Sequence, residues 1–189
     1  MQCIETALPG VLELRPRVFG DARGFFFESW QRERYAKLGM PTEFVQDNVS
    51  RSARGVLRGL HVQNPQAQGK LVQVLDGAVF DVAVDVRRGS PSFGRWAGVH
   101  LRASEHNQLW IPAGFAHGFL VLSDTALFQY KCTASYCAEC EFSIRYDDPE
   151  IGIDWPLDVQ PQLSAKDAAA PRLAGISPDR LPVYAGERG

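Results

Sequence analysis

The stretch Val72-Gln-Val-Leu-Asp-Gly-Ala-Val-Phe-Asp-Val-Ala-Val-Asp-Val86 predicts two β-strands joined by a tight turn. We expect strands at Val72–Leu75 and Val79–Val86, because both segments are rich in β-branched residues. Asp76-Gly77 between them is a turn signal, since glycine accepts the left-handed backbone that tight turns require. This part of the chain is therefore expected to form an antiparallel hairpin.

Working outward, the same pattern of short strands and turns covers most of the chain. Further strands are expected at Val56–Val62, Trp96–Leu101, Gln108–Ile111, His117–Leu122, Ala126–Lys131 and Phe142–Tyr146. Only Gln31–Leu38 and Ser164–Ala170 show a helical pattern, and the tail after Asp167 is expected to pack as irregular coil or to stay loose. Evenly spaced strands without intervening helices favour an all-β fold, an antiparallel β-barrel or jelly roll with a few short helices. Such a fold offers a mouth and an interior where a ligand can bind.

The bulk composition suits one compact domain over residues 1–189, because 45% of the residues are hydrophobic. A net charge of −2 argues against binding to nucleic acid or to an anionic membrane surface. No apolar run approaches the roughly 18 residues of a membrane helix. Residues 1–10 lack the pattern of a signal peptide, so a cytoplasmic location is expected.

The four cysteines are Cys3, Cys132, Cys137 and Cys140. In a chain without an export signal, they are expected to be thiols. Cys137 and Cys140 form a CxxC pair with Cys132 nearby, but three local thiols fall short of the four ligands of a structural zinc site. The βαβ context of a redox pair is also missing, so the spacing disfavours a metal or redox role.

His61 is a candidate for proton transfer, because imidazole titrates near neutral pH. The alternative is a buried histidine with a purely structural role. Arg58 precedes it by three residues, so the two side chains would point to opposite faces of a strand unless a bulge intervenes. Gly55 and Gly59 make such an irregularity plausible.

Three further features leave their roles open. On the strand Ala126–Lys131, Tyr130 shares a face with Ala126 and Phe128, where it either fills the interior or acts as an acid. Asp81 and Asp85 share the polar face of their strand, which turns either to solvent or to a polar interior. Ser164-x-x-Asp167 is typical of a helix N-cap with an acid in the first turn.

Gly55-x5-His61 and Pro112-x-Gly-x-x-His117 resemble the two halves of the cupin signature. In metal-binding cupins the first half continues with a second histidine and a glutamate, whereas this chain has Gln63 and then Ala67 and Gln68. Two imidazoles do not fill the three or four ligand positions of such sites. We therefore expect a cupin-type jelly roll without a metal and without a cofactor, which disfavours a metal-dependent cupin dioxygenase.

Several segments between Val18 and Asp167, in the same order along the chain as in the family, resemble the dTDP-4-dehydrorhamnose 3,5-epimerase family. These segments are Phe19–Glu28, Gln46–Asn48, Gly55–His61, Gln68–Lys70, Phe80–Asp85, Ile111–Phe119 and Leu163–Asp167. The resemblance implies a dTDP-linked 4-keto-6-deoxyglucose substrate and inversion at C3 and C5, the carbons that flank the ketone. A hydrogen on such a carbon is acidified, because the carbanion delocalises onto the ketone oxygen.

The resemblance also implies roles for single residues. His61 would be the base, oriented by Asp167 as a carboxylate orients a catalytic imidazole. Lys70 would stabilise the oxyanion, with Asp81 as a supporting residue. Tyr130 would return a proton from the opposite face, which favours inversion at C5.

Substrate-binding positions follow from the same resemblance. They are Arg23, Glu28, Gln46, Asp47, Asn48, Arg58, Lys70, His117, Glu141 and Lys166, together with Tyr136, which would stack on the thymine base. The family forms homodimers, so the partner subunit is expected to supply some contacts. The alternatives are an epimerase that acts on one carbon or on a related deoxy-keto-sugar nucleotide, and a non-catalytic sugar-nucleotide binder. Intact His61, Lys70, Tyr130 and Asp167 disfavour the latter.

Overall fold

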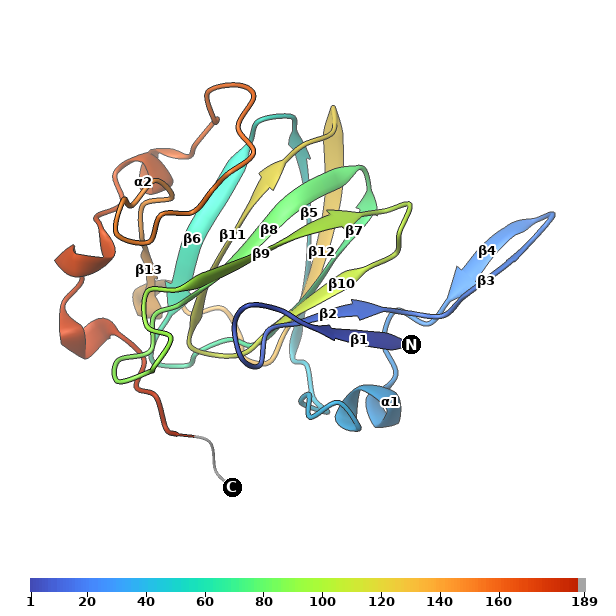
Figure 1. Cartoon of the computed structure of the whole chain (residues 1–189), viewed down its shortest axis with the longest axis horizontal. Helices are drawn as coiled ribbons and strands as arrows, with labels where there is room; N and C mark the ends of the chain where they lie inside the picture. The colour runs from blue at the N-terminus through green and yellow to red at the C-terminus, as the bar shows by residue number, and fades with distance from the viewer. Residues whose placement is uncertain (187–189) are drawn as a thin grey trace.

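The chain folds into two facing antiparallel β-sheets and a separate two-stranded hairpin in a computed structural model, which describes residues 1–186 (Figure 1). The six-stranded sheet has the order β1 (Gln2–Glu5), β2 (Leu12–Arg15), β10 (Gln108–Ile111), β7 (Lys70–Asp76), β12 (Thr125–Cys132), β5 (Gln46–Ala53). The five-stranded sheet has the order β13 (Glu141–Ser143), β6 (Leu57–Gln63), β11 (Phe115–Val121), β8 (Ala78–Asp85), β9 (Trp96–Arg102). The predicted all-β jelly roll with few short helices is confirmed.

The segment Val72–Val86 does form two strands, but the predicted hairpin between them is wrong. β7 pairs with β10 and β12 in one sheet, whereas β8 pairs with β9 and β11 in the other. Gly77 turns the chain from one sheet to the other with a φ of +83°. A Cβ at Gly77 would lie 2.1 Å from the carbonyl oxygen of Thr125, so only glycine fits where this turn packs against the start of β12.

Two apolar layers lie on the two faces of the five-stranded sheet. Val79 and Ala83 of β8 pack in the layer between the sheets, whereas Phe80 and Val82 pack in the outer layer. The outer layer is closed by the C-terminal segment, which buries Leu173, Ile176 and Leu181 and includes the short helices η2 (Leu173–Gly175) and η3 (Pro178–Arg180). The tail after Asp167 is therefore irregular but packed, beside β6 and β13 (Figure 1).

The N-terminal part contains strands that the sequence did not predict. Besides β1, β2 and β5, a hairpin of β3 (Val18–Asp21) and β4 (Gly24–Phe27) extends away from the two sheets (Figure 1). The predicted helices are present but shorter, as α1 (Arg32–Ala36) and α2 (Ala165–Ala168). Among the described residues, no helix is long and apolar enough to cross a membrane.

The prediction that all four cysteines are thiols is wrong. Cys137 and Cys140 form a disulfide, whereas Cys3 and Cys132 are free. The single turn of 3-10 helix η1 (Ala138–Cys140) brings the two Cα atoms to 5.3 Å, within the range that a disulfide requires. An argument from the cellular compartment could not anticipate this local geometry.

Candidate active site

A histidine–aspartate pair lies where β6 meets α2. His61 Nε2 lies 2.7 Å from Oδ1 of Asp167. The hydroxyl of Ser164 accepts a hydrogen bond from the backbone nitrogen of Asp167, which is the N-cap that the sequence predicted. Burial raises the pKa of Asp167, but hydrogen bonds from His61 and Ser164 outweigh it and leave the pKa below its ordinary value. The carboxylate is therefore charged at neutral pH and holds the proton of His61 on Nε2, which leaves Nδ1 as the basic nitrogen.

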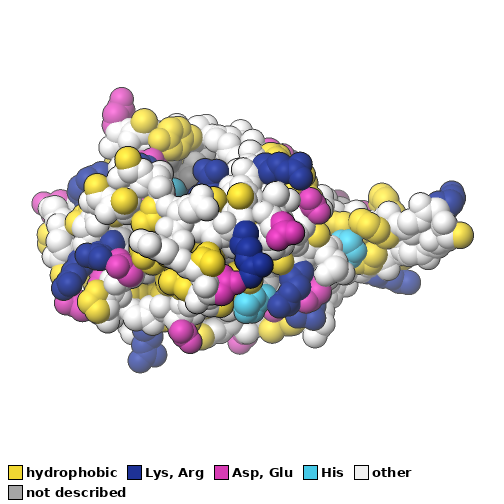
Figure 2. All heavy atoms as spheres, turned by 90° about the horizontal axis from the view of Figure 1, so that it is seen from above, with side chains coloured by type: hydrophobic (Ala, Val, Ile, Leu, Met, Phe, Trp, Pro, Cys, Tyr) yellow, Lys and Arg dark blue, Asp and Glu magenta, His cyan; other side chains and the backbone are white. Residues whose placement is uncertain are grey.

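Arg58 and His61 line the same cavity although they are three residues apart. The register between β11 and β6 shifts within this stretch, so β6 contains a bulge. Gly59 allows it, because its φ is +122° and a Cβ there would lie 2.5 Å from the Cα of Gly118. The cavity has a volume of about 320 Å³ and is also lined by Asp167. Figure 2, a view from above, shows a hollow on this face with histidine and Lys or Arg atoms beside it.

A second histidine–aspartate pair lies in the interior. His117 Nε2 is 3.0 Å from both carboxylate oxygens of Asp81, and both side chains are buried. Burial lowers the pKa of His117 and raises that of Asp81, while each group opposes the shift of the other. His117 and His61 are direct neighbours across the β11–β6 ladder. The polar face of β8 thus turns inward, although Asp85 binds the turn that follows the strand.

Lys70 and Tyr130 project from the opposite sheet. Lys70 Nζ lies 6.0 Å from the centroid of the Tyr130 ring. Burial lowers the pKa of Lys70, and the negative charge of Asp81 opposes this shift. Burial raises the pKa of Tyr130, with Arg58 opposing it. Tyr130 and Phe128 share the inner face of β12, as the alternation predicted. The imidazole of His61 and the phenol of Tyr130 therefore belong to opposing walls.

Strand β5 adds amide side chains to the inner face of the six-stranded sheet, beside β12. Gln46 donates a hydrogen bond to Asn48 at 2.9 Å, and Asn48 donates to the sulfur of Cys132 at 3.7 Å. Asp47 lies on the other face of the strand, where it forms a 2.7 Å ion pair with Lys131. The structure therefore separates Asp47 from the other predicted binding residues, because neighbouring residues of a strand point to opposite faces.

Sequence reasoning missed two polar groups of this wall. The guanidinium of Arg58 donates to the hydroxyl of Ser52 at 3.0–3.1 Å. Cys132 is buried, accepts from Asn48, and is the direct register partner of Lys70 in the β7–β12 ladder. Alternation along β12 from Tyr130 could have placed Cys132 on the inner face, but Ser52 carries no comparable signal. Within residues 1–186, no group of three or more His, Cys, Asp or Glu is arranged to hold a metal ion.

Tyr136, Glu141 and Lys166 meet at one end of the site. The Tyr136 hydroxyl donates to Glu141 Oε2 at 3.0 Å, and Lys166 forms an ion pair with the same oxygen. Burial raises the pKa of Glu141, but hydrogen bonds from Lys166 and Tyr136 bring it below its ordinary value. Lys166 is the neighbour of Asp167 on α2, so this cluster adjoins the histidine–aspartate pair.

The structure does not bring Arg23 and Glu28 to this cavity. Arg23 lies at the turn of the β3–β4 hairpin, where it forms a 2.5 Å ion pair with Asp21 and stays largely exposed. Glu28 follows β4 and forms an ion pair with Arg34 of α1. Within one chain, both residues are therefore remote from the other predicted binding residues.

Comparison with known proteins gives consistent matches. A family model described as dTDP-4-dehydrorhamnose 3,5-epimerase matches residues 5–175. The chain is 58% identical over 168 residues to the dTDP-4-dehydrorhamnose 3,5-epimerase of Pseudomonas aeruginosa, a match that covers 88% of this chain and 93% of that protein. The structure is similar to that of dTDP-6-deoxy-D-glucose-3,5-epimerase from Legionella pneumophila in complex with dTDP-4-keto-L-rhamnose, with a TM-score of 0.95 and 57% identity over 97% and 98% of the two chains.

A more distant match is a 3'-monoepimerase from Streptomyces bikiniensis in complex with dTDP-quinovose. It has a TM-score of 0.87 and 38% identity, over 94% of this chain and 91% of that chain. The match to the family model includes every segment on which the sequence resemblance rests, and the resemblance is confirmed. The chain belongs to the dTDP-4-dehydrorhamnose 3,5-epimerase family.

Proposed function

We propose that this chain converts dTDP-4-dehydro-6-deoxy-D-glucose to dTDP-4-dehydro-L-rhamnose by inversion at C3 and C5. The observation that carries the proposal is the arrangement of four groups around one interior. His61 with its partner Asp167 lies on one wall, and Lys70 and Tyr130 lie on the facing wall. A base, a cation and a phenol are the groups that proton transfer beside a ketone requires.

His61 acts as the base in this proposal. Its Nδ1 takes the proton from C3 or C5, and the electrons of the C–H bond move onto the ketone oxygen as an enolate. Asp167 stabilises the imidazolium that forms, because its carboxylate lies 2.7 Å from the other ring nitrogen. The proton lost to His61 passes to solvent, so the reaction exchanges these hydrogens with water.

Lys70 and Tyr130 complete the reaction. The ammonium of Lys70 stabilises the charge on the enolate oxygen, and the negative charge of Asp81 is one of the groups that oppose the lowering of the Lys70 pKa by burial. Tyr130 gives its phenolic proton to C5 from the face opposite His61 and regains a proton from solvent. Atoms and charge balance, because each inversion gives one proton to His61 and returns one on the opposite face, from Tyr130 at C5 and from water at C3. Arg58 and Lys166 are the cations of this chain that would bind the diphosphate.

The second candidate is an epimerase that acts at one carbon, which the similarity to the 3'-monoepimerase supports. The higher identity to 3,5-epimerases favours the double inversion. The product formed from dTDP-4-dehydro-6-deoxy-D-glucose, identified by NMR coupling constants, separates the two. The L-rhamno configuration supports the proposal, whereas a product inverted only at C3 establishes the alternative.

We also propose that two copies of the chain form a homodimer that completes the site. The β3–β4 hairpin exposes Phe19, Phe25 and Phe26 at 50–64% of their surface. Figure 1 shows the hairpin extending from the body, and Figure 2 shows hydrophobic side chains on the part that protrudes. β5 is an edge strand with Val49 exposed, so it can pair with a strand of another chain. The hairpin would then carry Arg23 and Glu28 to the site of the partner.

Pairing two chains with different defects, at a substrate concentration well below the raised KM, tests this assembly. We expect Arg23→Ala to raise KM by roughly 10- to 100-fold, since it removes a charge-assisted hydrogen bond to the diphosphate. A heterodimer of an Arg23→Ala chain and a His61→Ala chain has one intact site in two. Purified through two different tags, it should show about half of the wild-type activity per dimer.

The outcome differs if Arg23 acts within its own chain. Both sites of the heterodimer then lack a functional residue, and its activity stays at the level of the Arg23→Ala homodimer or below. A monomeric wild-type protein in light scattering at working concentration would also refute the homodimer. The cytoplasmic location stays a prediction.

A further inference from the structure

The segment Ala134–Glu141 carries Tyr136, the residue proposed to stack on the thymine base. Tyr136 is exposed at 56% of its surface, so packing alone does not fix it. Its hydroxyl contact to Glu141 lies at the tip of the side chain. Other groups must therefore hold the backbone of Tyr136 if its ring is to be pre-organised for stacking on the thymine base.

Three glutamine side chains hold the backbone on either side of Tyr136. Gln68 donates to the carbonyl oxygen of Ala134 at 2.9 Å, and Gln46 accepts from the nitrogen of Tyr136 at 2.8 Å. Gln63 contacts both residues that flank Tyr136. Its amide donates to the carbonyl oxygen of Ser135 at 2.9 Å and accepts from the nitrogen of Cys137 at 2.9 Å.

Of the three glutamines, Gln63 forms the most hydrogen bonds with backbone groups. It is buried, and it also donates to the carbonyl oxygen of Gln66 at 2.6 Å, so both amide hydrogens and the amide oxygen are engaged. It lies on β6 only two residues after His61. The rigid strand that presents the proposed base thus also fixes the loop that presents Tyr136.

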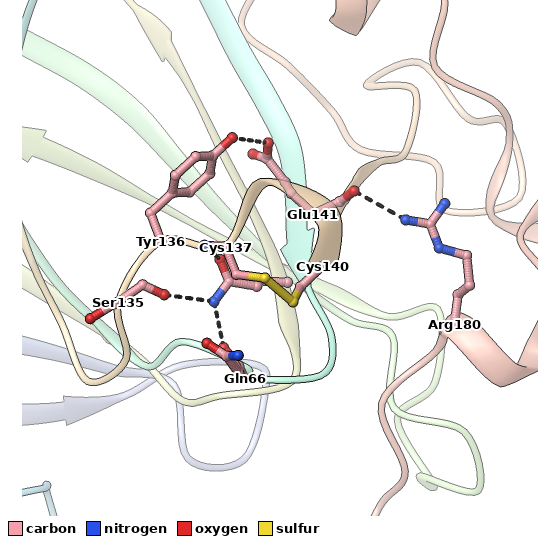
Figure 3. The surroundings of a disulfide bond; sticks show 8 residues. Gln66, Ser135, Tyr136, Cys137, Cys140, Glu141 and Arg180 are labelled. Atoms are coloured by element: carbon pink, nitrogen blue, oxygen red, sulfur yellow. Dashed lines mark hydrogen bonds between the residues drawn. A yellow bond between two sulfur atoms is a disulfide. The ribbon is translucent and has the colours of Figure 1, made fainter.

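The disulfide closes the other side of the same loop (Figure 3). It joins Cys137, whose nitrogen Gln63 binds, to Cys140, whose carbonyl oxygen accepts from the nitrogen of Asn64 at 3.0 Å. Arg180 donates to the carbonyl oxygen of Glu141 at 3.0 Å. The cross-link therefore ties the backbone after Tyr136 to a part of the loop that β6 already anchors.

We propose that Gln63 and the Cys137–Cys140 disulfide are positioning residues that hold Tyr136 for the base of the nucleotide. This inference rests on the proposed function. Neither group touches the keto-sugar in this scheme, so both act on nucleotide binding and not on proton transfer. Gln63 stands where metal-binding cupins have their second histidine, and here the position serves the nucleotide end of the site.

The disulfide makes nucleotide binding responsive to thiols. A dithiol reductant donates two electrons and two protons, the Sγ–Sγ bond breaks, two cysteine thiols form, and the reductant closes into its own disulfide. Cys137 is partly exposed and is therefore accessible to the reductant. Reduction removes one brace of the loop while Gln63 keeps the other.

The test measures the Kd of dTDP by calorimetry, together with KM and kcat, on the full-length protein. We expect Gln63→Met to raise Kd and KM about tenfold with kcat within about twofold, because the Ser135 and Cys137 backbone groups lose their partner. Gln73→Met is the matched control. Gln73 is similarly buried but binds Gln129 and Gln108, away from the loop, so its Kd should equal that of the wild type.

Reduction gives a second readout that needs no substitution. We expect dithiothreitol to raise the Kd of wild-type protein about threefold, and the Cys137→Ser/Cys140→Ser variant to show the raised value with or without reductant. Cys3→Ser, which alters an exposed free thiol, should respond like the wild type.

An unchanged Kd in both Gln63→Met and reduced wild-type protein would overturn the inference while leaving the proposed function intact. A loss of kcat at constant KM would also overturn it, because that result assigns Gln63 to the chemistry. If Gln63→Met fails to fold in thermal melting, reduced wild-type protein alone decides the outcome. Wild-type protein that binds no dTDP at all would refute the proposed function together with this inference.

Discussion

The His61→Ala protein will not exchange the C3 or C5 hydrogens of the keto-sugar with deuterium oxide, whereas wild-type protein exchanges both. Removal of a general base costs roughly 10²–10⁴-fold in rate. The loss is expected at both carbons, because His61 is partly open to the cavity, whereas the neighbouring imidazole of His117 is buried and held by Asp81. Proton NMR of the substrate in heavy water, followed over time, measures both positions at once.

His100→Ala is the matched control for this experiment. His100 lies on the exposed side of β9 and packs against Phe80 on the outer face of the five-stranded sheet. It should exchange both hydrogens at the wild-type rate. Wild-type exchange by the His61→Ala protein at either carbon would assign the base of that step to another residue.

The Tyr130→Phe protein will keep proton abstraction but lose inversion at C5. The substitution removes only the hydroxyl, so the ring still packs against Phe128 and beside Lys70. His61 remains able to remove the C5 proton, but the carbanion can take a proton back only from the side on which His61 lies. We expect deuterium at C5 with retained configuration, and a fall in the rate of L-rhamno product of roughly 10²–10⁴-fold.

Tyr184→Phe is the control for the loss of a tyrosine hydroxyl. The ring of Tyr184 packs against Arg87 and does not line the cavity. This variant should form product at the wild-type rate. Full inversion at C5 by the Tyr130→Phe protein would remove Tyr130 from the mechanism.

Strands with apolar residues on both faces were predictable from sequence, whereas β5, which adds polar side chains to the site, was not. β8 alternates between two apolar layers and carries a clear β-branched pattern. β5 was missed, because its inner face carries the polar residues Gln46, Asn48 and Ser52, and its outer face is exposed. A strand that lines a polar cavity lacks the alternation that identifies strands by sequence. The pairing of β7 was missed for another reason, since local turn signals do not specify which sheet a strand joins.

The structure brings several of the predicted site residues together, but their full geometry could not be predicted from sequence. Alternation placed Tyr130 on the inner face, and the glycine at position 59 indicated the bulge that brings Arg58 and His61 to one cavity. The contact of His61 with Asp167 joins residues 106 positions apart, which no local pattern can predict and only the family resemblance implied. The disulfide depends on one 3-10 turn and lay beyond composition and spacing.

The most direct test is a crystal structure of this chain with a dTDP-linked 4-keto-sugar bound. We expect His61 Nδ1 and the Tyr130 hydroxyl to approach the hexose ring from opposite faces, each about 3–3.5 Å from the carbon with which it exchanges a proton. We also expect Lys70 within hydrogen-bond distance of the ketone oxygen. A complex in which both groups lie on the same face of the ring, or in which the sugar lies outside the cavity between them, would contradict the account.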